Sequence, residues 1–266
     1  VWVSAENSEA KQRSDVQGLV SQEISVLILH AVNTSTAKEL VQHAAVAKIP
    51  VIAMDRLPAD AAVDLYVTAD SRKVGRIQAD FVAEKIGGKG DVVILEGEEG
   101  NSVARDITQG NLDAFKSHPG IRIVHRQAHK NWSRDLARVT VQNALEQHPS
   151  GVHAILANNS GMIMGAIDYL IERGLAGRVI TVGADADRNA CETIVAGHLQ
   201  ADVDKMPYEI GLAAYRSSLQ LVRRQTLESD GRIPNGSVDV PVRYTPVRLI
   251  TGDTVKQDMA YRWKGL

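Results

Sequence analysis

The chain has 266 residues and is 44% apolar, enough for one large hydrophobic core or two of ordinary size. Its formal net charge of -2 argues against a nucleic-acid partner, because phosphate binding normally requires a basic surface. No apolar run approaches the ~20 residues that a membrane-spanning helix needs, and the single cysteine, Cys191, has no partner for an internal disulfide.

Short apolar runs alternate with longer amphipathic ones along the chain, which is typical of βαβ units and a parallel sheet. The predicted strands cover residues 1–3, 25–29, 50–54, 65–67, 91–95, 121–125, 154–157, 179–183 and 201–203. The predicted helices cover residues 7–22, 36–47, 73–86, 105–118, 134–148, 162–173, 187–197 and 208–224. Residues 228–237 are rich in Gly, Pro and Asn and predict a loop before a last extended stretch at 238–250.

The predicted βα units are too many for one sheet of ordinary size. We therefore expect an α/β protein with two doubly wound parallel-sheet lobes. A cleft between two domains is a favoured place for a small-molecule site.

The predicted strand at 50–54 is followed directly by Asp55 and Arg56. In an open parallel sheet, ligands bind beyond the carboxyl ends of the strands. An ionised Asp accepts hydrogen bonds and an Arg presents five donors, so the pair suits a ligand with many hydroxyls. The structural alternatives are a strand-end ion pair and a helix cap.

Polar residues follow other strands in the same manner. Asn101 and Ser102 are cap candidates for the helix that carries Arg105 in its first turn, where a cation opposes the helix dipole. Trp132 lies in a connecting loop just before the predicted cap Ser133. It is either a hydrophobic staple over the helix start or a flat platform for the C–H face of a sugar ring.

The next three strands also end on polar side chains. Asn158 and Asn159 follow one strand, and we expect one of them to cap the next helix and the other to point at a ligand. Asp185 and Asp187 follow the next strand in the same way, and Lys205 lies between a strand and the helix-opening Pro207. His30 also ends a strand and is a further candidate.

Donors and acceptors are mixed in this set, which favours a neutral polyol over an anion. Common catalytic and cofactor motifs are absent from the sequence: it has no Gly-x-Ser-x-Gly elbow, no metal-spaced His or Cys pair, no dinucleotide fingerprint and no Walker loop. We therefore expect no catalytic residue, no metal and no cofactor.

Five segments, in this order along the chain, are similar to a known protein family: VIAMDRLPADAAVDLYVTADSRKVGRIQADFVAEKI at 51–86, NW at 131–132, ILANNSGMIMGAI at 155–167, VGADAD at 182–187 and DKMPY at 204–208. With them the chain resembles the type I periplasmic sugar-binding proteins of ABC importers, the ribose, galactose and xylose receptors, and most of all the xylose-binding proteins. The resemblance covers essentially all of the chain.

The resemblance implies two lobes joined by a three-segment hinge, with the ligand cleft between them. Residues 1–69 and 205–246 would form the N-terminal lobe, and residues 70–204 and 247–266 the C-terminal lobe. The family begins with a strand and helix before the segment that residues 1–3 match, so we expect that about one βα unit of ~35 residues precedes this sequence.

The resemblance places its sugar-binding residues on Asp55, Arg56, Trp132, Asn159, Asp185 and Lys205. A Lys at the last position is the choice of the xylose receptors. Asn101 and Arg105 are weaker assignments, because the loop reads Asn101-Ser102-Val103 and the usual Arg position holds Ile107. The sugar need not be xylose.

The implied function is an extracytoplasmic receptor, periplasmic or lipid-anchored and monomeric, that captures a monosaccharide or polyol by hinge closure and delivers it to an ABC permease. An alternative is the sugar-binding domain of a LacI-like repressor, which shares the fold. A two-domain α/β enzyme that acts on a sugar is the third.

Overall fold

The computed structural model describes residues 1–149 and 151–263. The chain forms two compact units. Unit 1 consists of Val1–Asp70, Gly100–Ser102 and Met206–Pro246, and unit 2 of Ser71–Glu99, Val103–Lys205 and Val247–Leu266. Residue 150 and residues 264–266, which the predicted C-terminal lobe includes, lie outside the described residues.

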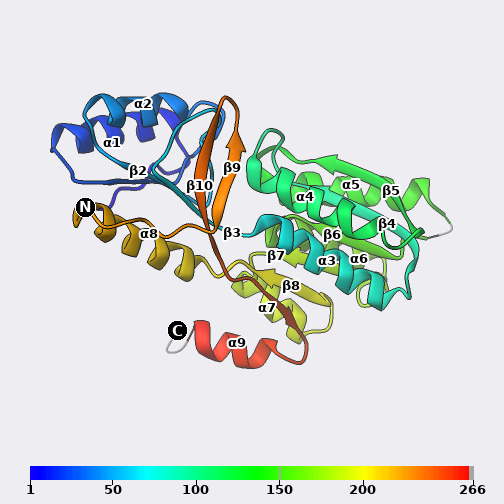
Figure 1. Cartoon of the computed structure of the whole chain (residues 1–266). Coiled ribbons are helices and arrows are strands. Elements are labelled where there is room, and N and C mark those ends of the chain that lie inside the picture. Colours follow the sequence, from blue (N-terminus) through cyan, green and yellow to red (C-terminus); the bar gives the residue numbers. More distant parts are fainter. Residues whose placement is uncertain (150, 264–266) are drawn as a thin grey trace. The chain divides into compact units, whose positions relative to one another are not determined.

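Unit 1 is a five-stranded sheet with helices on both faces. Its strand order is β1 (Leu27–Leu29), β2 (Val51–Met54), β3 (Leu65–Ala69), β10 (Val238–Thr245) and β9 (Gly231–Asn235). Neighbouring strands are parallel except β9, which is antiparallel to β10. Helices α1 (Glu9–Ser21) and α2 (Lys38–Val46) lie on one face, and α8 (Pro207–Val222) lies on the other (Figure 1).

Unit 2 is a six-stranded sheet. Its strand order is β11 (Arg248–Thr251), β8 (Ala201–Asp204), β7 (Ile180–Ala184), β6 (Ala154–Ala157), β4 (Lys89–Glu96) and β5 (Gly120–Ala128). Neighbours are parallel except β11, which is antiparallel to β8. Its helices are α3 (Ser71–Lys85), α4 (Ser102–Phe115), α5 (Arg134–Gln147), α6 (Ser160–Glu172), α7 (Arg188–Val195) and α9 (Val255–Arg262).

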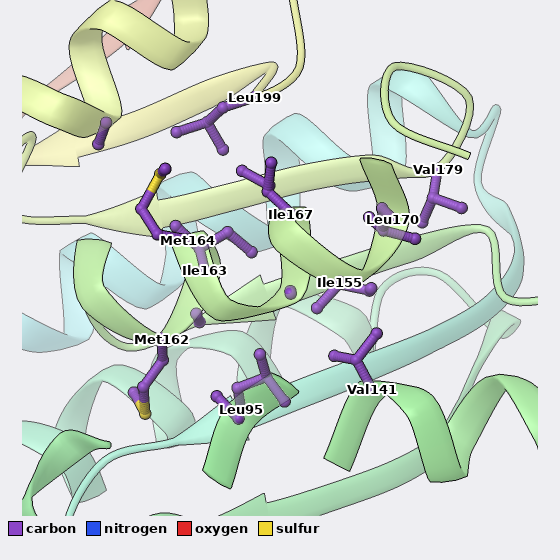
Figure 2. Packing of buried hydrophobic residues seen from close by; sticks show 14 of the residues in the cluster. Leu95, Val141, Ile155, Met162, Ile163, Met164, Ile167, Leu170, Val179 and Leu199 are labelled. Atoms are coloured by element: carbon purple, nitrogen blue, oxygen red, sulfur yellow. The ribbon is translucent and has the colours of Figure 1, made fainter. Parts of the chain in front are cut away.

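The core of unit 2 follows the two-residue period of its strands. In β4, Val92 and Ile94 pack with residues of α3 and α4 on one face, while Val93 and Leu95 pack with α5 and α6 on the other. Figure 2 shows the second layer, where Ile155 of β6 lies against Ile163 and Ile167 of α6. A sheet covered on both faces explains the continuous apolar runs of its strands, and the predicted α/β architecture with two parallel-sheet lobes is confirmed.

Two predicted elements differ from the structure. Residues 1–3 form no strand: Val1 and Trp2 are 99% and 87% exposed, and no described strand pairs with them. β1 lies at the sheet edge beside a groove of about 760 Å³. The β-branched pattern alone is insufficient, because a strand needs a partner for its ladder. The expected preceding βα unit stays a prediction.

The predicted loop at 228–237 contains β9, which forms a hairpin with β10. Pro234 is tolerated there because β9 is an edge strand. In the two-residue turn, Gly236-Ser237, Gly236 has φ 65°, in the left-handed region. The sequence prediction also missed α9 and the short 3-10 helix η1 (Lys130–Trp132).

Candidate functional site

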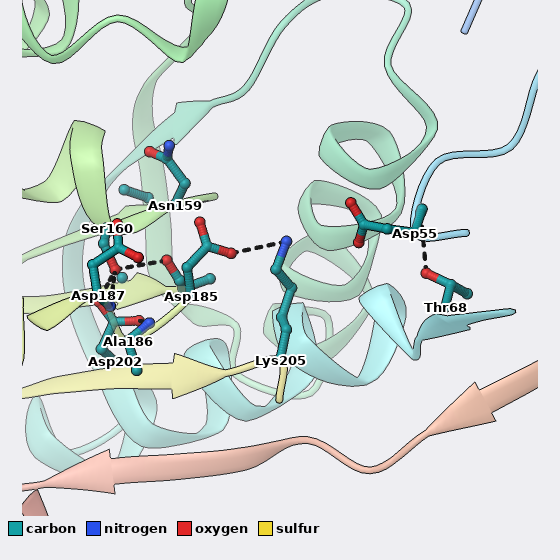
Figure 3. A network of polar contacts seen from close by, with 12 residues as sticks. Asp55, Thr68, Asn159, Ser160, Asp185, Ala186, Asp187, Asp202 and Lys205 are labelled. Atoms are coloured by element: carbon teal, nitrogen blue, oxygen red, sulfur yellow. Dashed lines mark hydrogen bonds and ion pairs between the residues drawn. The ribbon is translucent and has the colours of Figure 1, made fainter. Parts of the chain in front are cut away.

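In unit 1, the candidate residues lie where β2 ends. Asp55 has φ 62°, and its N–H donates to the Val67 carbonyl of the neighbouring strand at 2.8 Å. Its carbonyl accepts from the Tyr66 hydroxyl at 2.8 Å and from Thr68 Oγ1 at 3.2 Å (Figure 3). β2 leads through a loop to β3, so Asp55 caps no helix and that alternative is wrong. The backbone of Asp55 is therefore fixed by the sheet itself.

The side chains beside this strand end combine acceptors and donors. The Asp55 carboxylate lies 3.2 Å from His30 Nε2, at the end of β1, and its side chain is 23% exposed. Arg56 Nη1 donates to the carbonyls of Ala31 and Val32 at 3.4 and 3.2 Å. Arg56 Nη1 is thus bonded to the protein backbone, and the guanidinium has other N–H groups that can donate to a ligand. The strand-end His30 that the sequence singled out lies in this group.

In unit 2, a second polar group follows the neighbouring strands β7 and β8. Asp185 directly follows β7, and Lys205 directly follows β8. Lys205 Nζ lies 2.8 Å from Asp185 Oδ1, with side-chain exposures of 15% and 29% (Figure 3). Because both side chains are mostly buried, the ion pair orients them, and removing either partner would leave the other charge without its counterion. Met206, the residue before Pro207, is left-handed, and Pro207 opens α8 as predicted.

The two Asn residues after β6 have different roles. Asn158 is fully buried, and its Oδ1 accepts from the Gly97 N–H at 2.9 Å and from Thr108 Oγ1 at 3.1 Å. The expectation that the Asn that does not cap the helix points at a ligand is therefore wrong. Asn159 is partly exposed and caps α6, with Oδ1 accepting from the Met162 N–H at 2.8 Å. The cap uses only Oδ1, so Asn159 can still donate from Nδ2.

Asp187 occupies the corresponding cap position of α7, but its side chain makes no cap hydrogen bond. Asp187 thus does not fulfil the prediction that one of Asp185 and Asp187 caps this helix. Its N–H instead donates to the Ser160 hydroxyl at 3.2 Å, so the start of α7 is tied to α6.

Trp132 is half-buried at the end of η1, directly before Ser133, whose side chain caps α5 by accepting from the Leu136 N–H at 3.3 Å. A methyl group on Gly97 would overlap the Trp132 ring, so this glycine lets the ring pack on the backbone. The ring also contacts two apolar clusters of unit 2. Packing on this side fixes the ring and leaves part of it exposed.

Asn101 and Arg105 lie around the first turn of α4. Asn101 directly precedes the helix and is 8% exposed. The Arg105 side chain is 68% exposed, and its Nε lies 3.2 Å from Asp106 Oδ1. Their predicted role in binding stays a prediction.

Sequence reasoning missed the buried support beneath Asp185. Asp202, in the middle of β8, is fully buried and contacts Ser160 and the backbone of Ala186. A signal was present, since β8 reads Ala-Asp-Val-Asp and a buried carboxyl needs hydrogen-bond partners.

Two features are absent from the part of the chain that the structure describes. No helix there is long and apolar enough to cross a membrane. No group of three or more His, Cys, Asp or Glu side chains among those residues could hold a metal ion. The buried Cys191 is a poor nucleophile, because burial raises the pKa of its thiol to about 12.

Comparison with known proteins connects this geometry to a family. A family model described as a periplasmic binding protein domain matches residues 1–226. The D-xylose-binding periplasmic protein of Escherichia coli (strain K12) is 29% identical over 262 residues, covering 96% of this chain and 79% of that protein. The ribose import binding protein RbsB of Salmonella typhimurium (strain LT2) is 30% identical over 211 residues, covering 79% of this chain and 70% of that protein.

A solved structure agrees with these matches. An ABC transporter periplasmic solute binding protein from Actinobacillus succinogenes 130z, with bound D-allose, has a TM-score of 0.82 and 27% identity, covering 97% of this chain and 87% of its own. These relatives are named as binding proteins and not as enzymes. The family model covers most of the chain, and the chain therefore belongs to the periplasmic binding protein domain family.

Proposed function

We propose that the chain binds a monosaccharide or related polyol and delivers it to an ABC permease. The observation that carries the proposal is the pair of polar groups at strand ends: Asp55 with Arg56 in unit 1, and Asp185 with Lys205 in unit 2. Each group offers a carboxylate and a cation. Together they can accept from and donate to the hydroxyls of one neutral ligand.

Each side chain has a chemical role in this proposal. Asp55 accepts hydrogen bonds from adjacent hydroxyls, and Arg56 donates to ring or hydroxyl oxygens. The amide of Asn159 donates to a further hydroxyl, and the Trp132 ring stacks on the C–H face of the sugar. The backbone hydrogen bonds of Asp55 and the capping hydrogen bond of the Asn159 side chain keep the cost of ordering these groups low.

The proposed mechanism is hinge closure. The chain passes between the two units at five points, after residues 70, 99, 102, 205 and 246. A sugar bound to the groups of one unit favours conformations in which the other unit also contacts it, in proportion to its differential affinity for the two states. The closed form is the one that we propose the permease recognises, with the receptor acting as a monomer in the periplasm or lipid-anchored outside the cytoplasm.

For the sugar itself we propose a pentose or hexose of the xylose, ribose or allose type. Lys205 is the xylose-like choice at its position, and relatives of this chain are named for D-xylose and ribose. The departures at Asn101 and Ile107 count against a strict equivalence with xylose receptors. The repressor-domain alternative is not favoured, because the named relatives are binding proteins.

A thermal-shift screen of the purified chain with D-xylose, D-ribose, D-allose and myo-inositol tests the proposal. A ligand that binds only the folded chain stabilises it by RT ln(1 + [L]/Kd), or about 2.7 kcal/mol at a hundredfold excess over Kd. We expect at least one sugar to raise the melting temperature. If no monosaccharide or polyol did so, the receptor function would be rejected, and turnover of a sugar would favour an enzyme instead.

A further inference from the structure

A buried carboxyl group lies directly beneath the loop that carries Asp185. Asp202, in β8, is 0% exposed. Its Oδ1 accepts from the Ala186 N–H at 2.9 Å, and its Oδ2 lies 2.9 Å from the Ser160 hydroxyl oxygen (Figure 3). Asp202 therefore connects β8, the start of α6 and the β7–α7 loop within unit 2.

The loop above Asp202 has a backbone that needs support. Asp185 and Ala186 have φ of 99° and 50°, in the left-handed region that residues other than glycine rarely adopt. Such conformations cost free energy and persist only where surrounding contacts hold them. Here the Ala186 peptide is held at both ends, since its N–H donates to Asp202 and its carbonyl accepts from Arg262 Nη1 at 2.7 Å.

The neighbouring strand is shaped to accommodate this carboxyl. A Cβ atom on Gly183 of β7 would lie 2.5 Å from Asp202 Oδ2 and 2.7 Å from a methyl carbon of Ile163. Glycine at this position leaves the space that the carboxyl occupies. The arrangement is thus built from β7, β8 and the loop together.

Counting hydrogens shows which form of Asp202 completes the network. Ser160 has one hydroxyl proton but two acceptors in reach, Asp202 Oδ2 at 2.9 Å and the Ala184 carbonyl at 3.0 Å, and it also accepts from the Asp187 N–H. If Asp202 is protonated on Oδ2, it donates to Ser160, and Ser160 donates to Ala184. Only this form provides a proton for every hydrogen bond.

The electrostatic surroundings support the protonated form. Burial raises the pKa of Asp202 well above its usual range. The carboxylates of Asp185 and Asp187 raise it further, against the lowering by the Ala186 N–H and the Ser160 hydroxyl. The titratable groups nearby on α7 and α9 include the neutral Cys191 thiol, the Arg262 guanidinium, which is paired with Asp204 at 3.6 Å, and the Asp258 carboxylate, which is paired with Arg248 at 2.8 Å.

We infer that Asp202 is a positioning residue of the ligand site: as a neutral acid it holds the Ala186 peptide in the left-handed conformation that presents Asp185 to the sugar. The inference rests on the proposed function, and it adds to it a residue that touches no ligand. Asp202 acts through the loop, and Arg262 holds the same peptide from α9.

Two substitutions at one position separate this role from simple stability. Asp202→Asn keeps an acceptor and a donor in the same shape, whereas Asp202→Ala removes both. With D-xylose, D-ribose, D-allose and myo-inositol as probes, we expect Asp202→Ala to bind about tenfold or more weakly than wild type, and Asp202→Asn to stay within about threefold. Ile167→Val, a buried substitution in the same unit, is the control that lowers stability without touching the loop.

Nuclear magnetic resonance gives two readouts that need no ligand. In protein labelled with ¹³C at Asp carboxyls, one resonance should remain at the protonated position at pH 7 and be missing from Asp202→Asn. The Ala186 amide should exchange slowly in wild type and in Asp202→Asn, and at least tenfold faster in Asp202→Ala, because a buried hydrogen bond is lost.

The stability of the two proteins should also diverge with pH. In the unfolded chain the pKa of an Asp carboxyl is about 3.9. Between this value and its raised folded-state pKa, the carboxyl is protonated in the folded state and ionised in the unfolded state. Its contribution is complete below the unfolded pKa and is lost as pH rises through the folded pKa. The melting temperature of wild type should therefore fall relative to that of Asp202→Asn as pH rises above about 4.

Wild-type affinity in Asp202→Ala, or an ionised Asp202 at pH 7, would overturn the inference. If Asp185→Ala also bound like wild type, the proposed site would be wrong while the amide exchange still reported on the loop. If none of the four probes bound, the proposed function would fail, and the carboxyl resonance and amide exchange would still decide whether Asp202 holds the loop as a neutral acid.

Discussion

The two polar groups differ in what holds them. In unit 1, the Asp55 backbone is bonded to neighbouring β3, and Arg56 to the carbonyls of Ala31 and Val32. In unit 2, Asp185 belongs to a left-handed loop that rests on the buried carboxyl of Asp202. One group is supported by a strand end and its surroundings, and the other by a network of buried polar atoms.

The two groups should therefore differ in which mutations abolish their function. A strand-end group loses function when its own side chains are removed, because the sheet beneath it remains. A group on a buried polar network also fails when a residue that never meets the ligand is changed, since a buried polar atom without its partner costs about 1–3 kcal/mol. The comparison can be tested from both sides.

Removing Arg56 should have the largest effect. Arg56→Ala deletes the charged donor of unit 1, and loss of charge-assisted hydrogen bonds worth about 3 kcal/mol should weaken sugar binding roughly 100-fold or more. Isothermal titration calorimetry measures this. Arg13→Ala, which removes an exposed Arg of the same unit that is paired with Glu39, should bind like wild type. Unaltered affinity in Arg56→Ala would place the ligand elsewhere.

A single methyl group should disturb the network of unit 2. In Gly183→Ala the new Cβ would meet Asp202 and Ile163, and relief of this overlap should cost about 1–3 kcal/mol of unfolding free energy. Denaturant unfolding measures the change. A variant as stable as wild type would show that Asp202 has room to move and is not held tightly.

Trp132 tests the stacking role. Trp132→Ala should weaken sugar binding by about tenfold, the scale of an aromatic contact, and Trp132→Phe should recover most of it. Titration well below the melting temperature separates this effect from lost packing on Gly97. Equal affinities for wild type and Trp132→Ala would return Trp132 to a purely structural role.

The smallest change is expected at Gly18 of α1, which is the unit 1 counterpart of the Gly183 test. No atom lies within 4 Å of a Cβ placed there. Gly18→Ala should therefore stabilise the helix by up to about 1 kcal/mol, through helix propensity alone. A destabilised variant, measured by the same denaturant unfolding, would mean that α1 contacts something at this position.

The strand-end positions of the candidate residues could be predicted from the sequence, but the contacts that support them could not. Asp55 in unit 1, and Asp185 and Lys205 in unit 2, could be proposed because each directly follows a strand, and the carboxyl ends of parallel strands lie at one edge of their own sheet. The partners of Asp202 could not, because they depend on the adjacency of β7 and β8 and on Ser160, which lies 42 residues away along the chain. Hydrophobic periodicity shows that a position is buried, but it does not show which residues that position contacts.

The fold shows the same division. The βα alternation predicted both parallel-sheet lobes, although the sheet of unit 1 is completed by β10 and β9 from residues 231–245, far along the chain from β1–β3. The prediction missed β9, although a Gly236-Ser237 turn is a hairpin signal. The strand contains Gly231 and Pro234, residue types that usually indicate a loop. It placed a strand at residues 1–3, where the pattern fits but no described strand supplies a ladder.

The central claim is that one sugar contacts the polar groups of both units. Calorimetric titration of wild type, Asp55→Ala and Asp185→Ala with the sugar that gives the largest thermal shift tests it most directly. We expect measurable binding to wild type and at least tenfold weaker binding to each variant, because each removes charge-assisted hydrogen bonds. Wild-type affinity in either variant would contradict a site shared by the two units.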